Sequence, residues 1–245
     1  MSSPVVKVDS FRAAADSDQV SDNSYQGLRI HALAGLHEFV VNQAKAYLPR
    51  GSAILDVGAG SGAMSARLND VGYAVSAVDI VTKNFRLQNK VAFYEADLNA
   101  NFADLIGKAF DGLFAIEIIE HLENPRHFFR QCHQLLRPEG YLVLSTPNVD
   151  NPVSKALFNR AGYFHWFSDI NYRKEGHLTP LSQLQLHRIA AENKFAIEWQ
   201  GSMGNPFAHL KSWPRMRLLA KFCDLVSTIP KTLRGEVLML ILKKI

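Results

Sequence analysis

Three ionisable side chains follow one of the most apolar stretches of the chain. Glu117, Glu120 and His121 come directly after the run LFAI at residues 113–116. Burying an unpaired charge is expensive, so these groups at the end of an apolar strand indicate a site. If the chain turns helical there, residues three and four apart share one face and the three side chains converge. A histidine suits proton transfer at neutral pH, which makes His121 our candidate base; the alternative is a histidine that only closes the turn by bonding a backbone carbonyl.

The same residues also form a candidate metal site. Glu117 and Glu120 offer oxygen ligands, His121 offers nitrogen, and His177 in the segment EGHLTP offers a second nitrogen. A mixed oxygen and nitrogen set suits Mn, Co, Fe or Zn better than Mg. Glu120, His121 and His177 are therefore candidate catalytic residues, and a divalent metal held by these three and Glu117 is the second interpretation.

A glycine-rich loop precedes this cluster in the chain. The apolar run ILDV at residues 54–57 leads into Gly58, Gly60 and Gly62, and a second apolar run ends in Asp79. Glycines let the backbone approach a ligand closely, and an acid about 20 residues further on accepts hydrogen bonds from ribose hydroxyls in nucleotide-binding βαβ units. Because the loop also satisfies the G-x-G-x-x-G/A fingerprint, an NAD(P)-dependent oxidoreductase stays open on this pattern alone.

The neighbours of the loop resemble class I S-adenosylmethionine-dependent methyltransferases over about residues 50–147. The resemblance rests on Asp56 before the loop, on Gly62 as a third close glycine, on YEADL at 94–98 and on LLRPEGY at 135–141. It implies S-adenosyl-L-methionine as cofactor, bound by the following residues: Gly58, Gly60 and Gly62 under its methionine part, Asp56 near its amino group, Asp79 at the ribose, Asp97 and the Leu98 backbone at the adenine, and Glu117 at the rim.

Two further segments resemble particular groups of these enzymes. EHLENP at residues 120–125 and STPN at 145–148 are similar to segments of the ubiquinone-pathway and sugar O-methyltransferases. This implies O-methylation of a small hydroxylated acceptor, such as a glycan, a sugar nucleotide or a lipid-linked ring, by direct displacement with His121 as base. The E-x-x-E-H element also resembles the metal-dependent small-RNA 2′-O-methyltransferases, but the residues after His177 depart from their pattern, which disfavours a nucleic-acid acceptor. A non-catalytic scaffold that keeps the fold is the remaining alternative.

The elements that must position these residues alternate between strands and helices. Apolar runs predict strands near 53–57, 74–79, 91–94, 110–117, 141–146, 195–201 and 237–244. Runs that are apolar on both faces are typical of a parallel sheet covered on both sides, so we expect a doubly wound α/β fold with a mostly parallel, seven-stranded, Rossmann-like sheet. We also expect a leading helix over 29–47 and a later helix that Thr179 caps and Pro180 begins, ending near 193.

We expect residues 1–28 to be a flexible arm and residues 29–245 to be a single methyltransferase domain. Its predicted insertions are an aromatic-rich segment at 149–178 and a basic segment at 206–234. The chain has 245 residues, two distant cysteines, no signal-peptide pattern and no apolar run long enough to span a bilayer, which predicts a cytoplasmic protein.

Positive charge is concentrated near the end of the chain. Residues 206–245 hold eight Lys or Arg against two acids, a net charge of +6, whereas the whole chain carries +4. Such asymmetry suggests an anionic partner, and we expect residues 211–234 to contact an anionic membrane at its inner face. The alternative is ordinary packing, with long cationic side chains reaching solvent.

Overall fold

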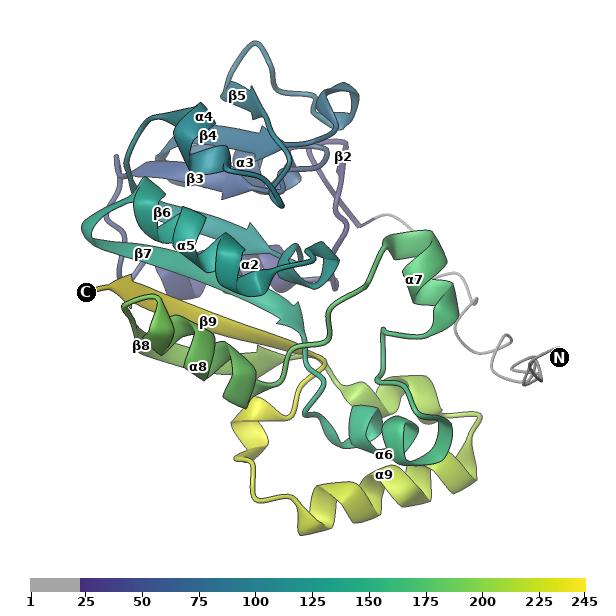
Figure 1. Cartoon of the computed structure of the whole chain (residues 1–245). Coiled ribbons are helices and arrows are strands. Elements are labelled where there is room, and N and C mark those ends of the chain that lie inside the picture. The colour runs from purple at the N-terminus through teal and green to yellow at the C-terminus, as the bar shows by residue number, and fades with distance from the viewer. Residues whose placement is uncertain (1–22) are drawn as a thin grey trace, which may run out of the picture.

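Figure 1 shows the computed structural model of the chain, which describes residues 23–245. Its centre is a seven-stranded sheet with the order β5-β4-β3-β6-β7-β9-β8. The strands are β3 (Ala53–Val57), β4 (Ala74–Asp79), β5 (Ala92–Glu95), β6 (Phe110–Ile116), β7 (Leu136–Pro147), β8 (Phe195–Met203) and β9 (Val237–Lys244). Only β9 runs antiparallel to its two neighbours. The prediction of a mostly parallel, doubly wound α/β sheet is confirmed.

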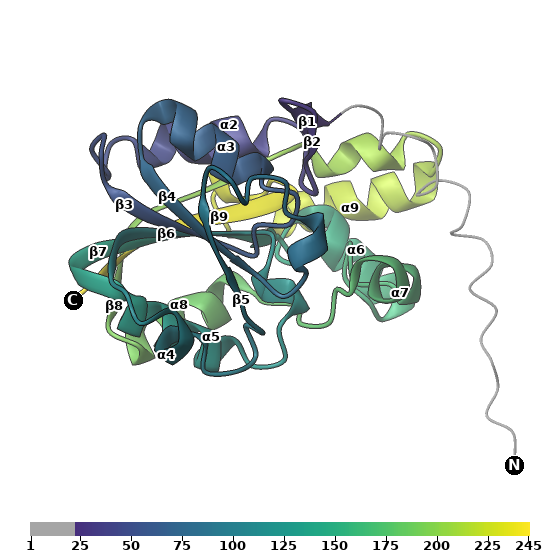
Figure 2. The same ribbon diagram turned by 90° about the horizontal axis from the view of Figure 1, so that it is seen from above.

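Helices cover both faces of the sheet (Figure 2). One face carries α2 (Leu36–Ala44) and α3 (Ala63–Val71), and the other carries α4 (Phe102–Ile106), α5 (Pro125–Leu135) and α8 (Gln183–Glu192). Each face has its own cluster of buried apolar side chains. This two-sided burial is the reason that the central strands are apolar on both faces.

The first helix is shorter than the predicted 29–47. It begins at Leu36, after Gly35 with a left-handed φ of 80°. Residues 24–29 instead form a hairpin of β1 (Ser24–Tyr25) and β2 (Leu28–Arg29). The hydroxyl of Tyr25 donates to Asp70 on α3, so this last part of the expected flexible arm is folded. Residues 1–22 of the predicted arm lie outside the described residues.

The predicted cap at Thr179 is wrong. Helix α8 begins at Gln183, and Ser182 caps it in a reciprocal pair of hydrogen bonds with Gln185. The Thr179 hydroxyl donates to the carbonyl of Leu122 over 2.6 Å instead. A contact distant in sequence therefore takes the hydroxyl that the local pattern assigned to a helix end.

The two predicted insertions fold largely as helices beyond the carboxyl end of β7, as both views show (Figures 1 and 2). They contain α6 (Pro152–Ala161), α7 (Asp169–Glu175), η4 (Pro206–Leu210), α9 (Pro214–Val226) and η5 (Lys231–Leu233). Two shorter 3₁₀ helices, η2 (Thr82–Asn84) and η3 (Ile119–His121), follow β4 and β6. Helices α6 and α9 share a small core that includes Val153, Leu157, Met216 and Ala220. No helix among residues 23–245 is long and apolar enough to cross a membrane.

Candidate active site

The residues singled out in the sequence gather at the carboxyl edge of the sheet. The strand order reverses between β3 and β6, which are neighbours although β4 and β5 separate them in the chain. Ligands of open α/β sheets bind at such a reversal, outside the carboxyl ends of the strands. The glycine loop follows β3 and Glu117 follows β6, so both segments lie at this point.

The glycine loop combines one crowded position with one open position. Gly58 and Gly60 have left-handed φ values of 78° and 52°, which side chains rarely adopt. A Cβ atom at Gly58 would lie 2.6 Å from the Ile118 side chain, whereas one at Gly60 would meet nothing within 4 Å. The backbone at Gly60 is therefore open to a ligand, while Gly58 is required for packing.

This contrast predicts different results for the two alanine variants. We expect Gly58→Ala to destabilise the fold by more than about 1 kcal/mol, because the added methyl clashes with Ile118 in a strained backbone. Gly60→Ala is expected to fold but to bind S-adenosylhomocysteine at least about tenfold more weakly, because its methyl enters the open space. Chemical denaturation and titration calorimetry check the pair; equal cofactor affinity of Gly60→Ala and the native chain would contradict it.

Asp79 lies at the end of β4 beside this loop. Its two carboxylate oxygens accept hydrogen bonds from the amides of Gly60, over 2.8 Å, and Val81, over 2.9 Å. A carboxylate offers about four acceptor positions, so capacity is left for two ligand hydroxyls. The free acceptor positions of Asp79 are compatible with the predicted ribose contact, which stays a prediction.

Asp97 and Leu98 follow β5 at the same edge of the sheet. Asp97 is exposed and accepts a hydrogen bond from the amide of Asn99 over 2.8 Å, and the Leu98 side chain is buried in the core. The Asp97 side chain therefore stabilises its own turn, and the adenine contact of these two residues stays a prediction.

Asp56 is buried below the loop. It is 2 % exposed and accepts a hydrogen bond from the Ser65 hydroxyl on α3. Burial raises the pKa of Asp56 to about 7, although the bond to Ser65 opposes the shift. The structure thus shows Asp56 bonded within the protein, and its predicted contact with the cofactor amino group stays a prediction.

The raised pKa of Asp56 makes the free energy of unfolding depend on pH. A carboxyl whose folded pKa lies above its unfolded value stabilises the fold at low pH and loses that contribution as pH rises from about 4 through 7. We expect Asp56→Asn to be more stable than the native chain at pH 8, by roughly 2–4 kcal/mol, and equal to it near pH 4. Urea denaturation across this range checks the sign, and a difference independent of pH would contradict it.

Glu117 leaves the strand in an unusual backbone conformation. Its φ is 51°, in the left-handed region that few non-glycine residues occupy, and such strain is concentrated at functional sites. Its carboxylate accepts a hydrogen bond from the Ser145 hydroxyl over 2.8 Å, and its amide donates to the same hydroxyl. Burial raises the pKa of Glu117 to about 7.

Glu120 is the most enclosed ionisable group of the cluster. It is 0 % exposed; its Oε2 accepts from the Thr146 hydroxyl over 3.1 Å, and its Oε1 has no hydrogen-bond partner within residues 23–245. Burial and the charge of Glu117 raise the pKa of Glu120 well above its usual range. An orphaned buried carboxylate oxygen is costly, which indicates that a cation or proton completes it.

His121 and His177 meet beside the Glu120 carboxylate. Their ring centroids are 4.9 Å apart, and one ligand atom from each histidine and one from Glu120 all lie within 4.8 Å of one another. The structure thus brings together three of the four predicted metal ligands, while Glu117 bonds Ser145 instead. Burial and the nearby His177 lower the pKa of His121, which keeps its ring neutral and able to accept a proton at pH 7.

The protein fixes the orientation of His177 through its backbone. The Nδ1 atom of His177 lies 2.7 Å from the carbonyl oxygen of Trp166. Because a carbonyl only accepts, Nδ1 carries a proton, so in the neutral ring the lone pair lies on Nε2, 3.8 Å from a carboxylate oxygen of Glu175. Trp166 itself has a left-handed φ of 69°, and the amides of Leu178 and Thr179 both donate to the Glu120 carbonyl over 2.9 Å. These contacts hold the distant segment against η3.

The supporting residues Ser145, Thr146 and Trp166 were given no role by the sequence. The first two lie on β7 where it pairs with the end of β6, in the register Ile116 opposite Ser145. Reading the register of the neighbouring strand would have found them, because side chains at the ends of paired parallel strands are adjacent. No local signal marks Trp166, since its contribution is a carbonyl.

A family comparison decides what kind of protein carries this site. The model of a family described as "Methyltransferase domain" matches residues 25–199, which is most of the chain. The chain belongs to this methyltransferase family. The match decides between the two interpretations of the glycine loop, in favour of a class I S-adenosylmethionine-dependent methyltransferase and against the oxidoreductase.

Curated relatives and solved structures agree with this family. The methyltransferase is 33 % identical over 113 residues to a mitochondrial ubiquinone biosynthesis O-methyltransferase of Rattus norvegicus, covering 40 % of this chain and 31 % of that one. It is 31 % identical over 150 residues to a ubiquinone biosynthesis O-methyltransferase of Xanthomonas axonopodis pv. citri, covering 58 % and 61 %. The chain thus spans about one third to three fifths of these relatives.

A SAM-dependent methyltransferase structure from Archaeoglobus fulgidus matches with a TM-score of 0.57 at 19 % identity, covering 85 % of this chain and 94 % of that one, which shows the shared fold.

The residues present fit S-adenosylmethionine. The open backbone at Gly60 leaves room for the ligand, and Asp79 retains free acceptor positions for ribose hydroxyls. The carboxylates of Glu117 and Glu120 are enclosed at this edge of the sheet, and a sulfonium charge bound nearby would reduce the cost of burying them. That the cluster with His121 faces the reactive end of the cofactor stays a prediction.

Proposed function

We propose that this methyltransferase methylates a hydroxyl oxygen of a small acceptor, such as a glycan, a sugar nucleotide or a lipid-linked ring. The observation that carries the proposal is the cluster of Glu120, His121 and His177, whose ligand atoms lie within 4.8 Å of one another. A hydroxyl must lose its proton to become a good nucleophile, and this cluster is built to remove or stabilise charge there. The names of the curated relatives, which are O-methyltransferases, support the same choice.

The side chains contribute positioning and proton transfer. S-adenosylmethionine supplies the methyl group, whose bond to sulfur breaks as its bond to the acceptor oxygen forms. His121 takes the hydroxyl proton, and the fixed Nε2 of His177 and the Oε1 of Glu120 hold the acceptor oxygen or a cation bound to it. Much of the acceleration in such a displacement comes from holding two reactants in line, so the rigid backing of η3 by residues 177–179 is part of the function.

A divalent cation is part of this proposal. Glu120 and His177 would hold it beside His121, and it would lower the pKa of the acceptor hydroxyl. His121 would serve either as the base or as a third ligand of the cation, because a neutral imidazole has one lone pair. The unpartnered Oε1 of Glu120 supports this role, as does the Nε2 of His177, which lies 3.8 Å from a second carboxylate, that of Glu175. We expect a chelator to reduce turnover at least about tenfold and added Mn²⁺ or Zn²⁺ to restore it, while binding of S-adenosylhomocysteine stays unchanged. Full turnover after metal removal, verified by elemental analysis, would leave His121 as a base without a cation.

The acceptor class is tested with the purified full chain and radiolabelled methyl donor. Catechol-type rings with and without isoprenoid tails, sugar nucleotides and short RNAs are offered at equal concentration. Label on the oxygen of a ring or sugar is the expected result. Label on RNA alone, with binding that weakens steeply as salt rises, would instead favour the RNA methyltransferase. Binding of S-adenosylhomocysteine without label on any acceptor would favour the scaffold.

A further inference from the structure

The outward side of α9 exposes apolar side chains that a water-facing helix normally lacks. Leu218, Phe222, Leu225 and Val226 are 71 %, 60 %, 83 % and 60 % exposed. They are four of the twelve exposed large apolar residues of residues 23–245, and all lie within the last nine residues of this helix. Scattered exposed apolar residues are ordinary, but a cluster of this kind marks an interaction surface.

Helical periodicity places this cluster opposite the buried side of α9. Met216 and Ala220 pack against α6, and Leu218, Phe222 and Leu225 recur at spacings of four and three on the other side. One side of α9 thus packs against α6, and the opposite side, which faces solvent, is also apolar. Nothing in residues 23–245 covers that side.

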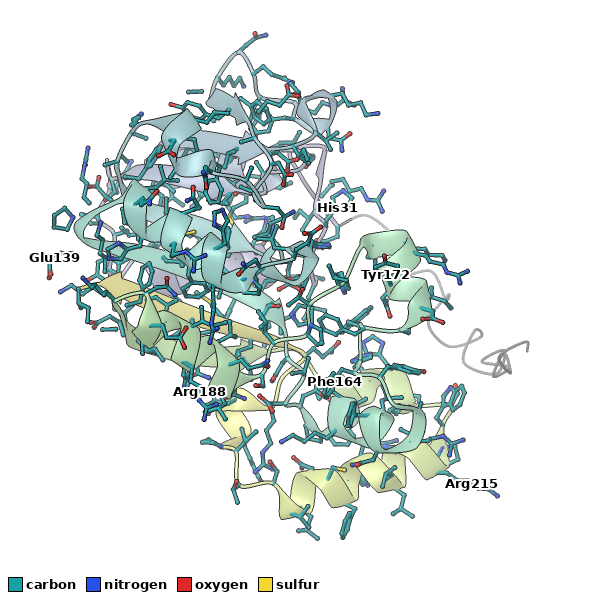
Figure 3. The ribbon with its side chains drawn as sticks, in the orientation of Figure 1. His31, Glu139, Phe164, Tyr172, Arg188 and Arg215 are labelled. Carbon is teal, nitrogen blue, oxygen red and sulfur yellow. The ribbon has the colours of Figure 1, made fainter. Side chains whose placement is uncertain are left out.

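Positive charges flank the apolar row. Lys211, Arg215, Arg217 and Lys221 are all exposed, and none of them forms an ion pair with another residue of 23–245. Asp224 is the one acid of α9, and the guanidinium of Arg234 neutralises it over 2.7 Å. Figure 3 shows Arg215 projecting outward at one end of α9. We call these four cations and the four apolar residues the α9 outer face.

A groove lies beside this face. It has a volume of about 420 Å³ and is lined by the apolar Phe158, Phe164 and Val226 and by the polar Lys155, Asn159 and Thr228. The rings of Phe158 and Phe164 stack with centroids 4.6 Å apart. Phe158, Phe164 and Val226 extend the apolar surface from α9 to α6, where Lys155 pairs with Asp150 over 3.9 Å.

We propose that the α9 outer face binds the surface of an anionic lipid bilayer. An interfacial helix of this type inserts its apolar row to the depth of the headgroups while lysines and arginines at its margins contact anionic lipids. A second copy of the chain is disfavoured, because a symmetric contact would bring the same arginines and lysines of both copies together. The exposed positive charges therefore favour an anionic partner, and the unbroken apolar row favours a bilayer.

The position of the α9 outer face indicates a function for the bilayer contact. Helices α6, α7 and α9 lie together beyond the carboxyl end of β7, on the same side as the active site (Figures 1 and 2). The segment after α6 leads to His177, so a bilayer bound by α9 and an acceptor carried by a lipid would lie on the same side of the sheet. This consequence rests on the proposed function, whereas the bilayer contact itself does not.

Vesicle sedimentation with the full chain tests the contact without any turnover. We expect binding to vesicles of phosphatidylcholine mixed with phosphatidylglycerol, and at least about tenfold weaker binding to phosphatidylcholine alone. The double variant Phe222→Ser with Leu225→Ser is expected to lose at least about tenfold in binding. Its matched control is Leu105→Ser with Leu184→Ser. This control removes two exposed leucines, one from α4 that is 57 % exposed and one from α8 that is 58 % exposed.

A charge variant gives an independent readout. Arg217→Glu is expected to weaken binding to the anionic vesicles more than about fivefold, because it replaces an attraction by a repulsion. Arg188→Glu is the matched control, because Arg188 is an exposed cation on α8 and not part of the α9 outer face, and it should bind as the native chain does (Figure 3). All variants alter exposed side chains, so unchanged thermal unfolding is expected and is measured alongside.

Several outcomes would overturn the contact. One is no sedimentation with either vesicle at low salt, and another is equal loss in the α9 variants and their controls. A native chain that is dimeric in solution, becomes monomeric in the Phe222→Ser, Leu225→Ser variant and ignores vesicles would assign the face to a second copy. Vesicle binding by a chain that methylates only water-soluble acceptors would keep this inference and remove the lipid-linked acceptor, so the two failures are distinguishable.

Discussion

Replacing Asp79 with alanine is expected to weaken the binding of S-adenosylhomocysteine by about a hundredfold. Hydrogen bonds that involve a charged group are worth about 1.5–3 kcal/mol each, and 1.4 kcal/mol is a factor of ten in affinity. The variant also removes the acceptor for the amides of Gly60 and Val81, which loosens the loop that the ligand must contact. Titration calorimetry with the purified variant measures the effect.

Two further variants separate the causes of this loss. Asp79→Asn keeps one carbonyl acceptor and should bind with intermediate affinity. Asp104→Ala removes an exposed carboxylate from α4, at a distance from the glycine loop, and should bind normally. If Asp79→Ala is folded and binds as tightly as the native chain, the ribose does not lie at the end of β4.

The sheet could be predicted almost residue by residue because its cause is local in the sequence. Runs such as 53–57 and 237–244 are apolar on both faces, and the structure begins and ends those strands at the predicted residues. The strand predicted at 141–146 begins at Leu136 instead. The chain on both sides of Glu139 belongs to the same strand, although Glu139 itself has a left-handed φ of 64°. Such a continuation has no apolar signal to announce it.

The errors arose where long-range contacts override a local pattern. Apolar residues at helical spacing predicted a helix from residue 29, but residues 24–29 pair as a hairpin held to α3 by Tyr25 and Asp70, and the helix begins only after Gly35. Thr179 followed by Pro180 is a good helix start, yet its hydroxyl bonds Leu122 and helix α8 begins later. Neither partner can be identified from its neighbours in the sequence.

The candidate site was predictable in its residues and less so in its geometry. Glu117 was expected to share a helical face with Glu120 and His121. The structure instead ends β6 with a left-handed turn at Glu117, and only Glu120 and His121 enter the short helix η3. Glu117 therefore bonds Ser145. His177 joins Glu120 and His121 as the third member of the cluster, and its position depends on the whole course of residues 148–176.

Replacing His121 with alanine is expected to lower turnover by about 10²–10⁴ while leaving the affinity for S-adenosylhomocysteine unchanged. A positioned base contributes an acceleration of this size. The affinity should not change, because the His121 ring lies beside His177, with the two centroids 4.9 Å apart, and not on the glycine loop. His187→Ala is the matched control, because that partly buried histidine bonds Gln200 away from the site. Single-turnover rates with saturating methyl donor separate chemistry from binding.

The double variant of His121 and His177 decides whether the cluster acts as one unit. Groups that act together in catalysis are strongly non-additive, so the double variant should lose little more rate than His121→Ala alone. If the two losses instead multiply, the histidines act independently, with His121 on the proton and His177 on the position of the acceptor. If His121→Ala turns over at the native rate, neither the base nor the cation belongs at this residue, and proximity alone must supply the acceleration.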